Sequence, residues 1–186
     1  MSVKEVMRDA EDRMKKTLST LQQSYATVRS GKASVQMLDG IRVDYYGTMT
    51  PLNQMASVSS PEAHLLVVQP WDKEAVDGIV RAIQTSDLNL NPQVDGQIIR
   101  IPIPALTEER RKELVKVVKK MAEESKVAVR NIRRDANDSL KKIEKSKDIS
   151  EDQRADAEDE VQTLTDQHIE QIDDLAQDKE NEVMQV

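Results

Sequence analysis

Three long segments of this chain carry a narrow stripe of apolar residues that recur every three or four positions. Such spacing predicts amphipathic helices, and at roughly two apolar positions per seven the stripes are as narrow as those of coiled coils. A single helix with such a stripe is marginal in water, so the three segments predict an elongated antiparallel three-helix bundle. The stripes are Val3, Met7, Ala10, Met14, Leu18, Leu21, Tyr25 and Val28; Leu114, Val118, Met121, Ser125, Ala128, Ile132, Ala136, Leu140 and Ile143; and Ala157, Val161, Leu164, His168, Ile172, Leu175, Lys179 and Val183.

Capping patterns mark where these helices begin. Ser2 with Glu5, and Ser150 with Gln153, have the spacing of a capping box, in which each residue's side chain bonds the other's backbone N–H. Thr107 fits an N-cap, and the two acids that follow it suit the positive end of the helix dipole. We therefore expect the helices to begin at residues 2, 107 and 150 and the first to run to residue 30.

Residues 31–104 have a different character, because all five Gly, all six Pro and the only Trp lie there. Short β-type runs at residues 41–46, 55–60, 65–69 and 97–103 are separated by turn residues, and one short helix fits residues 72–84. The sequence thus predicts an α+β protein. A bundle domain (1–30 plus 105–186) would carry an inserted small β/α/β domain (31–104).

The chain crosses twice between these domains, and the two crossings predict a two-stranded hinge. Two linkers with little contact area make relative motion the default expectation. The predicted hinge residues are Ser30, Gly31, Pro102, Pro104 and Ala105. A Gly31→Pro substitution is expected to stiffen this hinge.

The net charge of −7 hides a strong asymmetry along the chain. Residues 107–149 carry 14 Lys and Arg against nine Asp and Glu, whereas residues 150–186 carry two against 13. Within the basic segment, cationic residues recur at helical spacing, and Glu123 is the only break in their stripe. The stripe comprises Lys112, Lys116, Lys119, Lys126, Arg130 and Arg133, and Lys120 and Arg134 widen it.

This basic stripe has an ordinary and a functional interpretation. Each member lies about 200° around the helix from an apolar position, so the whole stripe is predicted to face solvent. The ordinary interpretation is the solvated face of a coiled coil. Here, however, the acids that usually alternate with such lysines are displaced onto the third helix. A continuous stripe with several arginines favours a surface that binds phosphates.

The sequence offers little for catalysis, for a cofactor or for a metal. It has no Cys, no Gly-rich phosphate loop and no zinc spacing. Its two histidines are His64, beside a strand, and His168, in an apolar stripe. The acids Asp156, Glu158, Asp159 and Glu160 do not converge on one helical face, so a solvated surface is favoured over a cation site. No run approaches the roughly 20 apolar residues of a membrane helix. We expect a soluble, cytoplasmic, non-enzymatic protein.

The aromatic residues of the middle segment could form a platform on which bases stack. Tyr45 and Tyr46 are adjacent, and Trp71 lies in the same domain. Adjacent residues on a strand point to opposite faces, so at least one tyrosine is expected in the core. A structural role is therefore favoured for this group.

Several motifs resemble those of the bacterial ribosome recycling factor family, and together they span essentially the whole chain. The run at residues 127–137, Val-Ala-Val-Arg-Asn-Ile-Arg-Arg-Asp-Ala-Asn, is the most specific. The others are residues 44–47 with 50–52, 86–88 with 91–92, 106–111, and 178–180 with Glu182. Asn89 stands where the family commonly has Gly, and because Asn tolerates left-handed geometry we expect that turn to survive.

The resemblance implies an L-shaped protein whose three-helix bundle carries a hinged β/α/β domain. It implies a factor that binds the post-termination ribosome, with its bundle on large-subunit ribosomal RNA and its inserted domain toward the small subunit. Elongation factor G, by hydrolysing GTP, would then drive separation of the subunits and release of mRNA and tRNA. The factor would bind no nucleotide itself, and we expect it to be a monomer.

The predicted RNA-binding residues combine the stripe with this resemblance. Arg130 and Arg133 lie in the matched motif and should contact RNA phosphates. Arg29 lies at the end of the first helix, and in the family it is usually followed by Thr-Gly-Arg. Here Ser30 and Lys32 replace that Thr and Arg. Lysine keeps the positive charge but lacks the two-pronged guanidinium that can bind a phosphate through two hydrogen bonds. The full set is Arg29, Lys32, Lys116, Lys119, Lys126, Arg130, Arg133 and Arg134.

Two other function classes stay open at this point. A coiled-coil adaptor would bind a protein partner through the acidic third helix and would keep that partner after the basic stripe is neutralised. An enzyme of unknown chemistry would have only the carboxylates at residues 156–160 to support it.

Overall fold

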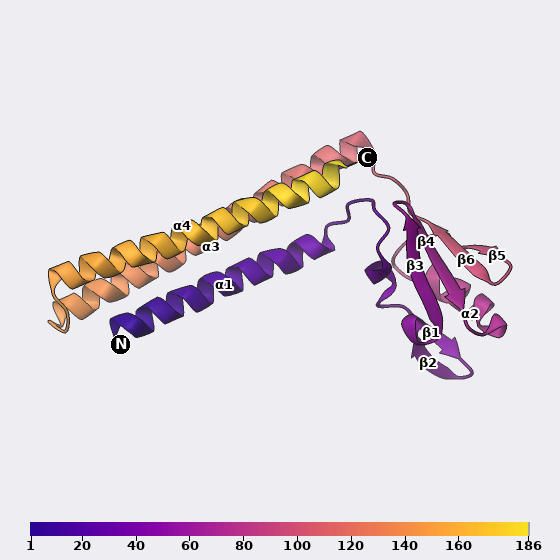
Figure 1. Ribbon diagram of the computed structural model, residues 1–186, viewed down its shortest axis with the longest axis horizontal. Coiled ribbons are helices and arrows are strands. Elements are labelled where there is room, and N and C mark those ends of the chain that lie inside the picture. The colour runs from indigo at the N-terminus through magenta and orange to yellow at the C-terminus, as the bar shows by residue number, and fades with distance from the viewer. Residues whose placement is uncertain (186) are drawn as a thin grey trace. The chain divides into compact units, whose positions relative to one another are not determined.

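The computed structural model describes residues 1–185, which form two compact units: residues 1–30 with 108–185, and residues 31–107. The first unit is a bundle in which three long helices each pack against the other two (Figure 1). The second combines a sheet, a hairpin and a short helix. This architecture confirms the predicted α+β class, a three-helix bundle with an inserted β-sheet domain. The elements are α1 (Val3–Thr27), β1 (Arg42–Tyr45), β2 (Thr48–Pro51), β3 (Ala56–Glu62), β4 (Leu65–Pro70), α2 (Val76–Gln84), β5 (Gln93–Asp95), β6 (Ile98–Pro102), α3 (Glu108–Lys145) and α4 (Glu151–Met184).

Capping boxes fix the starts of two bundle helices. The Ser2 hydroxyl accepts from the Glu5 backbone N–H at 3.2 Å, while the Ser2 backbone N–H donates to the Glu5 carboxylate at 2.8 Å. Ser150 and Gln153 bond in the same way at 3.2 and 2.9 Å. Both capping predictions are confirmed. The first helix is shorter than predicted and ends at Thr27, because the backbone at Val28 is already extended.

The bundle core is thin and largely aliphatic. Met14, Val118, Leu140, Val161 and Ile172 are fully buried within it. At roughly 1.5–3 kcal/mol for each such side chain, burial along three long helices offsets the entropy cost of ordering them. Within residues 1–185, no helix combines the length and the apolar character needed to cross a membrane.

The buried face of the long helices is displaced from the predicted stripe at the middle of the bundle. Each helix packs against two neighbours, so the residue that points between them lies nearest the bundle axis and is often small. The residues buried there are Ala122 and Val129 in place of Met121 and Ala128, and Thr165 and Ala176 in place of Leu164 and Leu175.

Polar groups in this core find partners on the helices. The Tyr25 hydroxyl donates to the Val118 carbonyl at 2.8 Å and so joins α1 to α3. Burial, reinforced by the charge of Glu180, raises the pKa of Tyr25 to about 12. Thr165 and His168 bond carbonyls one turn earlier in α4, each at 2.8 Å. His168 is therefore a packed residue, as its place in the stripe predicted.

The inserted unit contains an antiparallel four-stranded sheet, in the order β3-β4-β6-β5, and a separate β1–β2 hairpin. The predicted strands at residues 41–46, 55–60, 65–69 and 97–103 correspond to β1, β3, β4 and β6. The sequence did not reveal β2 and β5. Neither alternates between buried and exposed positions, so no period-two signal marks them. Asn89 has a positive φ of 53°, which confirms the left-handed turn expected there.

Both ends of the inserted unit are fastened to the turn between β3 and β4. The His64 ring Nδ1 donates to the Gly31 carbonyl at 2.8 Å, and the His64 carbonyl accepts from Ile103 N–H at 2.8 Å. Pro102, predicted as a linker residue, instead ends β6 and pairs with Leu65. Gly31 has a φ of 76°, which a proline ring cannot adopt. Gly31→Pro would thus disrupt this segment, and the expectation that it merely stiffens a hinge was wrong.

We expect Gly31→Ala to destabilise the inserted unit by about 1–3 kcal/mol. A Cβ at this position would lie 2.9 Å from Leu106 Cγ and 3.2 Å from the Leu106 backbone nitrogen, in a left-handed conformation. Gly40→Ala is the matched control, because a Cβ there meets nothing within 4 Å. Urea unfolding of both variants of the full chain measures the difference. Equal stability of the two would show that the Gly31 geometry is unstrained.

We also expect Tyr45→Phe to raise the pKa of Asp72 toward its ordinary value. The Tyr45 hydroxyl donates to Asp72 Oδ2 at 2.7 Å and the Glu74 backbone N–H donates to Oδ1 at 3.0 Å, and both bonds lower the pKa of Asp72. A lowered folded-state pKa means that Asp72 stabilises the fold above its unfolded pKa and ceases to do so as pH falls through the folded value. An NMR titration of the Asp72 carboxyl measures this shift.

Tyr46→Phe is the control for this titration, since the Tyr46 hydroxyl is the weakest of the groups that lower the Asp72 pKa. It should raise the pKa less than Tyr45→Phe does. The reverse order would contradict the assigned hydrogen bond.

Candidate nucleic-acid interface

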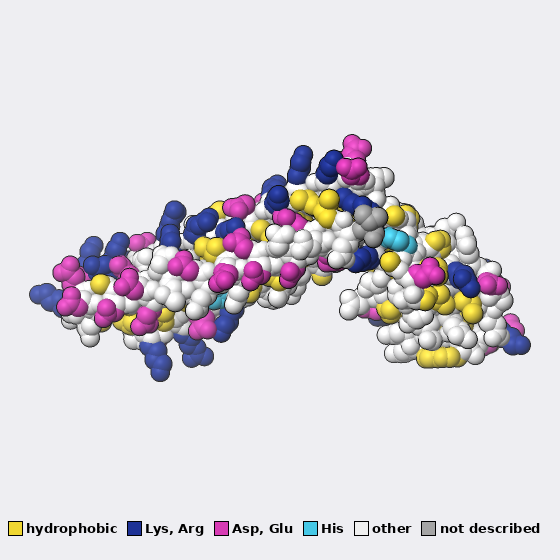
Figure 2. All heavy atoms as spheres, turned by 45° about the horizontal axis from the view of Figure 1, so that its top comes forward, with side chains coloured by type: hydrophobic (Ala, Val, Ile, Leu, Met, Phe, Trp, Pro, Cys, Tyr) yellow, Lys and Arg dark blue, Asp and Glu magenta, His cyan; other side chains and the backbone are white. Residues whose placement is uncertain are grey.

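One face of α3 carries a row of exposed cationic side chains. Lys116, Lys119, Lys120 and Arg134 are exposed and Arg130 is half-buried. Among the described residues, none of these five forms an ion pair with an acid. Figure 2 shows Lys and Arg side chains in a row along one edge of the bundle, with Asp and Glu on the face beside it. Cations without intramolecular partners are available to phosphates, which is the chemistry the stripe predicted.

Lys126 departs from this row. Its side chain is only 16% exposed and forms ion pairs with Glu123 at 3.3 Å and with Asp173 of α4. The hydrogen bond with Asp173 raises the pKa of Lys126. Because the buried face of α3 at this level runs through Ala122 and Val129, Lys126 lies at the α3–α4 boundary. The prediction that the whole stripe faces solvent was therefore wrong at this residue.

Arg133 lies at the same boundary but keeps most of its donors. It is half-buried, and its Nη1 donates to Oε1 of Gln162 on α4 at 3.2 Å. A guanidinium carries five N–H donors, so this contact orients the group without exhausting it. Arg133 can thus still contact a phosphate beside the row.

The remaining predicted residues lie off α3. Arg29 is exposed just after the end of α1, in the bundle unit, whereas Lys32 is exposed in the inserted unit. The structure thus brings together on one helix face only Lys116, Lys119, Arg130 and Arg134 of the predicted set, with Arg133 at its edge.

The basic face also extends further than predicted. Lys141 and Lys145 are exposed and follow Arg134 at steps of seven and four residues, which keeps them on the same side of α3. The signal that could have found them is the same helical spacing, followed beyond the matched motif to the end of the helix.

The neighbouring helix α4 presents acids and no available cation. Arg154 bonds Glu144 and, at 2.8 Å, Glu158, and Lys179 bonds Glu182 at 3.2 Å. Both cations of residues 150–185 are therefore engaged within the bundle. No group of three or more His, Asp and Glu side chains in the part of the chain that the structure describes is placed to hold a metal ion.

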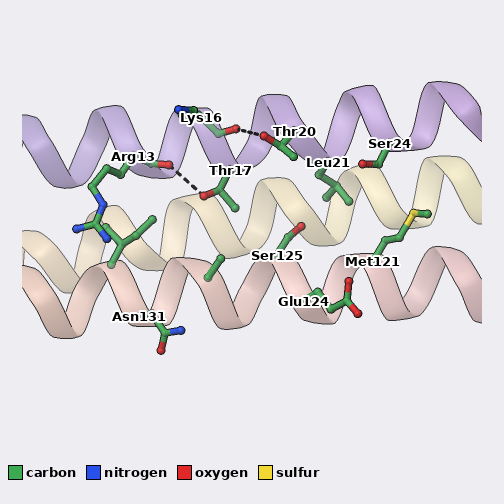
Figure 3. Close-up of a pocket in the computed structure, with 12 residues that line it drawn as sticks. Arg13, Lys16, Thr17, Thr20, Leu21, Ser24, Met121, Glu124, Ser125 and Asn131 are labelled. Atoms are coloured by element: carbon green, nitrogen blue, oxygen red, sulfur yellow. Dashed lines mark hydrogen bonds between the residues drawn. The ribbon is translucent and has the colours of Figure 1, made fainter.

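A groove runs between α1 and α3 of the bundle (Figure 3). Leu21, Met121 and Ile132 contribute apolar surface to it. The hydroxyls of Thr17 and Thr20 bond backbone carbonyls of their own helix at 3.0 and 2.9 Å. Arg13 at its rim is paired with Asp135 of α3 at 2.8 Å. Thr17, Thr20 and Arg13 thus find their partners within the bundle.

Of the three aromatic residues in the inserted unit, one packs against the core and two are exposed. Tyr45 packs against the core of the unit and bonds Asp72. Tyr46 and Trp71 are 78% and 69% exposed. The structural interpretation therefore holds for Tyr45 and not for the other two.

Comparison with known proteins places the chain in a family. The family described as ribosome recycling factor matches residues 21–184. The ribosome-recycling factor of Bacillus subtilis (strain 168) is 55% identical over 183 residues, covering 98% of this chain and 99% of that protein. That of Halalkalibacterium halodurans is 57% identical over 183 residues, with the same coverage of 98% and 99%.

Two solved structures extend the likeness to the fold. The solution structure of a ribosome recycling factor is 40% identical, covers 100% of this chain and 99% of its own, and has a TM-score of 0.77. A ribosome recycling factor of T. thermophilus, placed with E. coli elongation factor G on the E. coli post-termination complex, is 46% identical over 100% of both chains, with a TM-score of 0.63. The chain therefore belongs to the ribosome recycling factor family, whose members are translation factors and not enzymes.

Proposed function

We propose that this protein binds the post-termination ribosome and, with elongation factor G, splits it into subunits so that mRNA and tRNA are released. The GTP hydrolysis that drives the step belongs to elongation factor G. The relative from T. thermophilus is described on such a complex together with that factor, which supports the same role here. This protein would contribute binding and mechanical coupling as a monomer, without a cofactor.

The observation that carries the proposal is the unpaired basic face of α3 in a chain of net charge −7. An acidic protein gains nothing in solubility from a row of unpaired cations, whereas RNA phosphates attract such a row strongly. We propose that this face docks on ribosomal RNA of the large subunit. Its contacts would be Lys116, Lys119, Arg130, Arg133 and Arg134, with Arg29 and Lys32 as further contacts near the junction of the units.

The inserted unit would act toward the small subunit, and the junction would permit its rotation. Ser30, Pro104 and Ala105 lie where the chain passes between the units, while Gly31 is held by His64 within the inserted unit. We propose that rotation takes place at Ser30 and at residues 104–107, and that the bonds of His64 keep the inserted unit rigid as it turns.

Light scattering of post-termination ribosomes tests the proposed function. Mixing them with this protein, elongation factor G and GTP should lower the scattering, because free subunits scatter less than whole ribosomes. The drop should require all three additions. No drop with a cognate elongation factor G would contradict the proposal.

Within the basic face, we expect Arg130→Gln and Lys126→Gln to have different effects. Arg130 has no intramolecular ion pair, so its loss should weaken binding to purified large subunits about tenfold. It should also flatten the salt dependence by about one unit of slope.

Lys126→Gln breaks the pairs with Glu123 and Asp173 and should lower bundle stability while leaving the salt slope nearly unchanged. Sedimentation binding across a salt titration, with thermal melting of each variant, separates the two effects. If both variants flatten the salt dependence of binding equally, Lys126 must contact RNA as Arg130 does.

A further inference from the structure

An exposed apolar residue, Val127, lies at the middle of the basic face of α3. Val127 is 51% exposed. It stands seven residues from Lys120 and seven from Arg134, so both cations lie about two turns away on the same side of the helix. This places a cation roughly 10 Å to either side of the Val127 methyl groups along the axis.

Charges of both signs surround Val127, with Glu124 and the unpaired Arg130 three residues away on either side. Glu123 and Lys126 form an ion pair at 3.3 Å, and Lys126 is held again by Asp173. Asn131, one turn beyond Val127, is exposed and neutral. Around Val127 the face therefore combines charges of both signs with an exposed apolar side chain, which differs from the uniform positive stripe that electrostatic attraction alone would favour.

The bundle also lacks the side chains that hold unpaired bases. In residues 1–30 and 108–185, Tyr25 is the only aromatic residue, and it is buried with its hydroxyl bonded to Val118. Binding of single strands relies on bases stacked against exposed aromatic rings. Base-paired RNA instead displays its phosphates and, in a wide and shallow minor groove, its riboses.

We propose that Val127 is an RNA-contacting residue, seated on the riboses of base-paired RNA while the cations on either side bind the flanking phosphates. The inference rests on the proposed docking of α3 on ribosomal RNA and adds an apolar, shape-dependent contact at its centre. Such a contact reads no base sequence. It fixes the position of the helix along the RNA, which phosphate contacts alone fix less well.

The test compares Val127→Lys with Val127→Ala in the full chain, using purified large subunits as the probe. A lysine adds charge to the face but removes the branched methyl groups. We expect both variants to bind about threefold to tenfold more weakly, the range for losing one or two methyl-sized contacts. Tighter binding of Val127→Lys with a steeper salt slope would overturn the proposal and leave a purely electrostatic face.

Val117→Lys is the matched control. Val117 is also an exposed valine of α3, at 40%, but lies about 80° around the helix from Val127. It should bind as tightly as the wild type or slightly tighter, and circular dichroism should show all three variants folded. A loss equal to that of Val127→Lys would mean that any added lysine perturbs binding, and this would overturn the specific contact.

A second arm tests the form of the RNA. The wild type should bind an RNA hairpin more tightly than a single strand of the same composition, and the preference should shrink in Val127→Lys. Equal binding of the two RNAs would overturn the proposed contact between Val127 and base-paired RNA. Failure of the wild type to bind large subunits at all would instead refute the proposed docking itself, so the two failures are distinct.

Discussion

The thin aliphatic seam shared by α1, α3 and α4 is the constraint on which the rest of the bundle depends. Its layers are built from residues such as Val118, Val161 and Ile172, with no large aromatic ring except Tyr25. Each layer therefore buries little area, and enough is buried only when many layers are stacked. This explains why α3 and α4 are 38 and 34 residues long. It also explains why no one of the helices would be stable without the other two.

A thin seam leaves most of each helix's circumference in water, and the protein uses that surface to separate its charges. Like charges one turn apart, as at Lys116 and Lys120 on α3 or Glu170 and Asp174 on α4, destabilise a helix by about 0.2–0.5 kcal/mol per pair. Many of the opposite charges that would relieve this repulsion lie on the other helix. Opposite charges of α3 and α4 meet at the boundary between the helices, where Lys126 bonds Asp173 and Arg154 bonds Glu144. The separation thus opposes stability, which is why it supports a role in binding.

The features that the sequence predicted well depend on neighbouring residues, and those it missed depend on packing. The capping boxes at Ser2 and Ser150 are complete within four residues, so their geometry could be anticipated. The burial of Lys126 depends on which side of α3 faces α4. A narrow apolar stripe shows where one neighbouring helix packs, but it does not show where the second neighbour of a three-helix bundle lies. The strand β5 has no buried residue, and Gly31 takes its positive φ where it packs closely against Leu106 and bonds His64, both distant in the sequence. Neither leaves a local signal in the sequence.

An acidic helix beside the basic face of α3 has a consequence for the affinity that this face would have for RNA. Packed helices lie 8–10 Å apart, which is about the screening length at physiological salt. The acids of α4 would therefore reduce the attraction between α3 and RNA, but screening would prevent them from cancelling it. They would also oppose any docking that brought α4 against phosphates, which favours an approach by the basic face of α3. A protein that carried the same basic row on a neutral bundle would bind RNA more tightly and in more orientations. The charge asymmetry would thus favour one docked orientation at moderate affinity, which suits the proposed function, in which the protein must leave the subunit after each round.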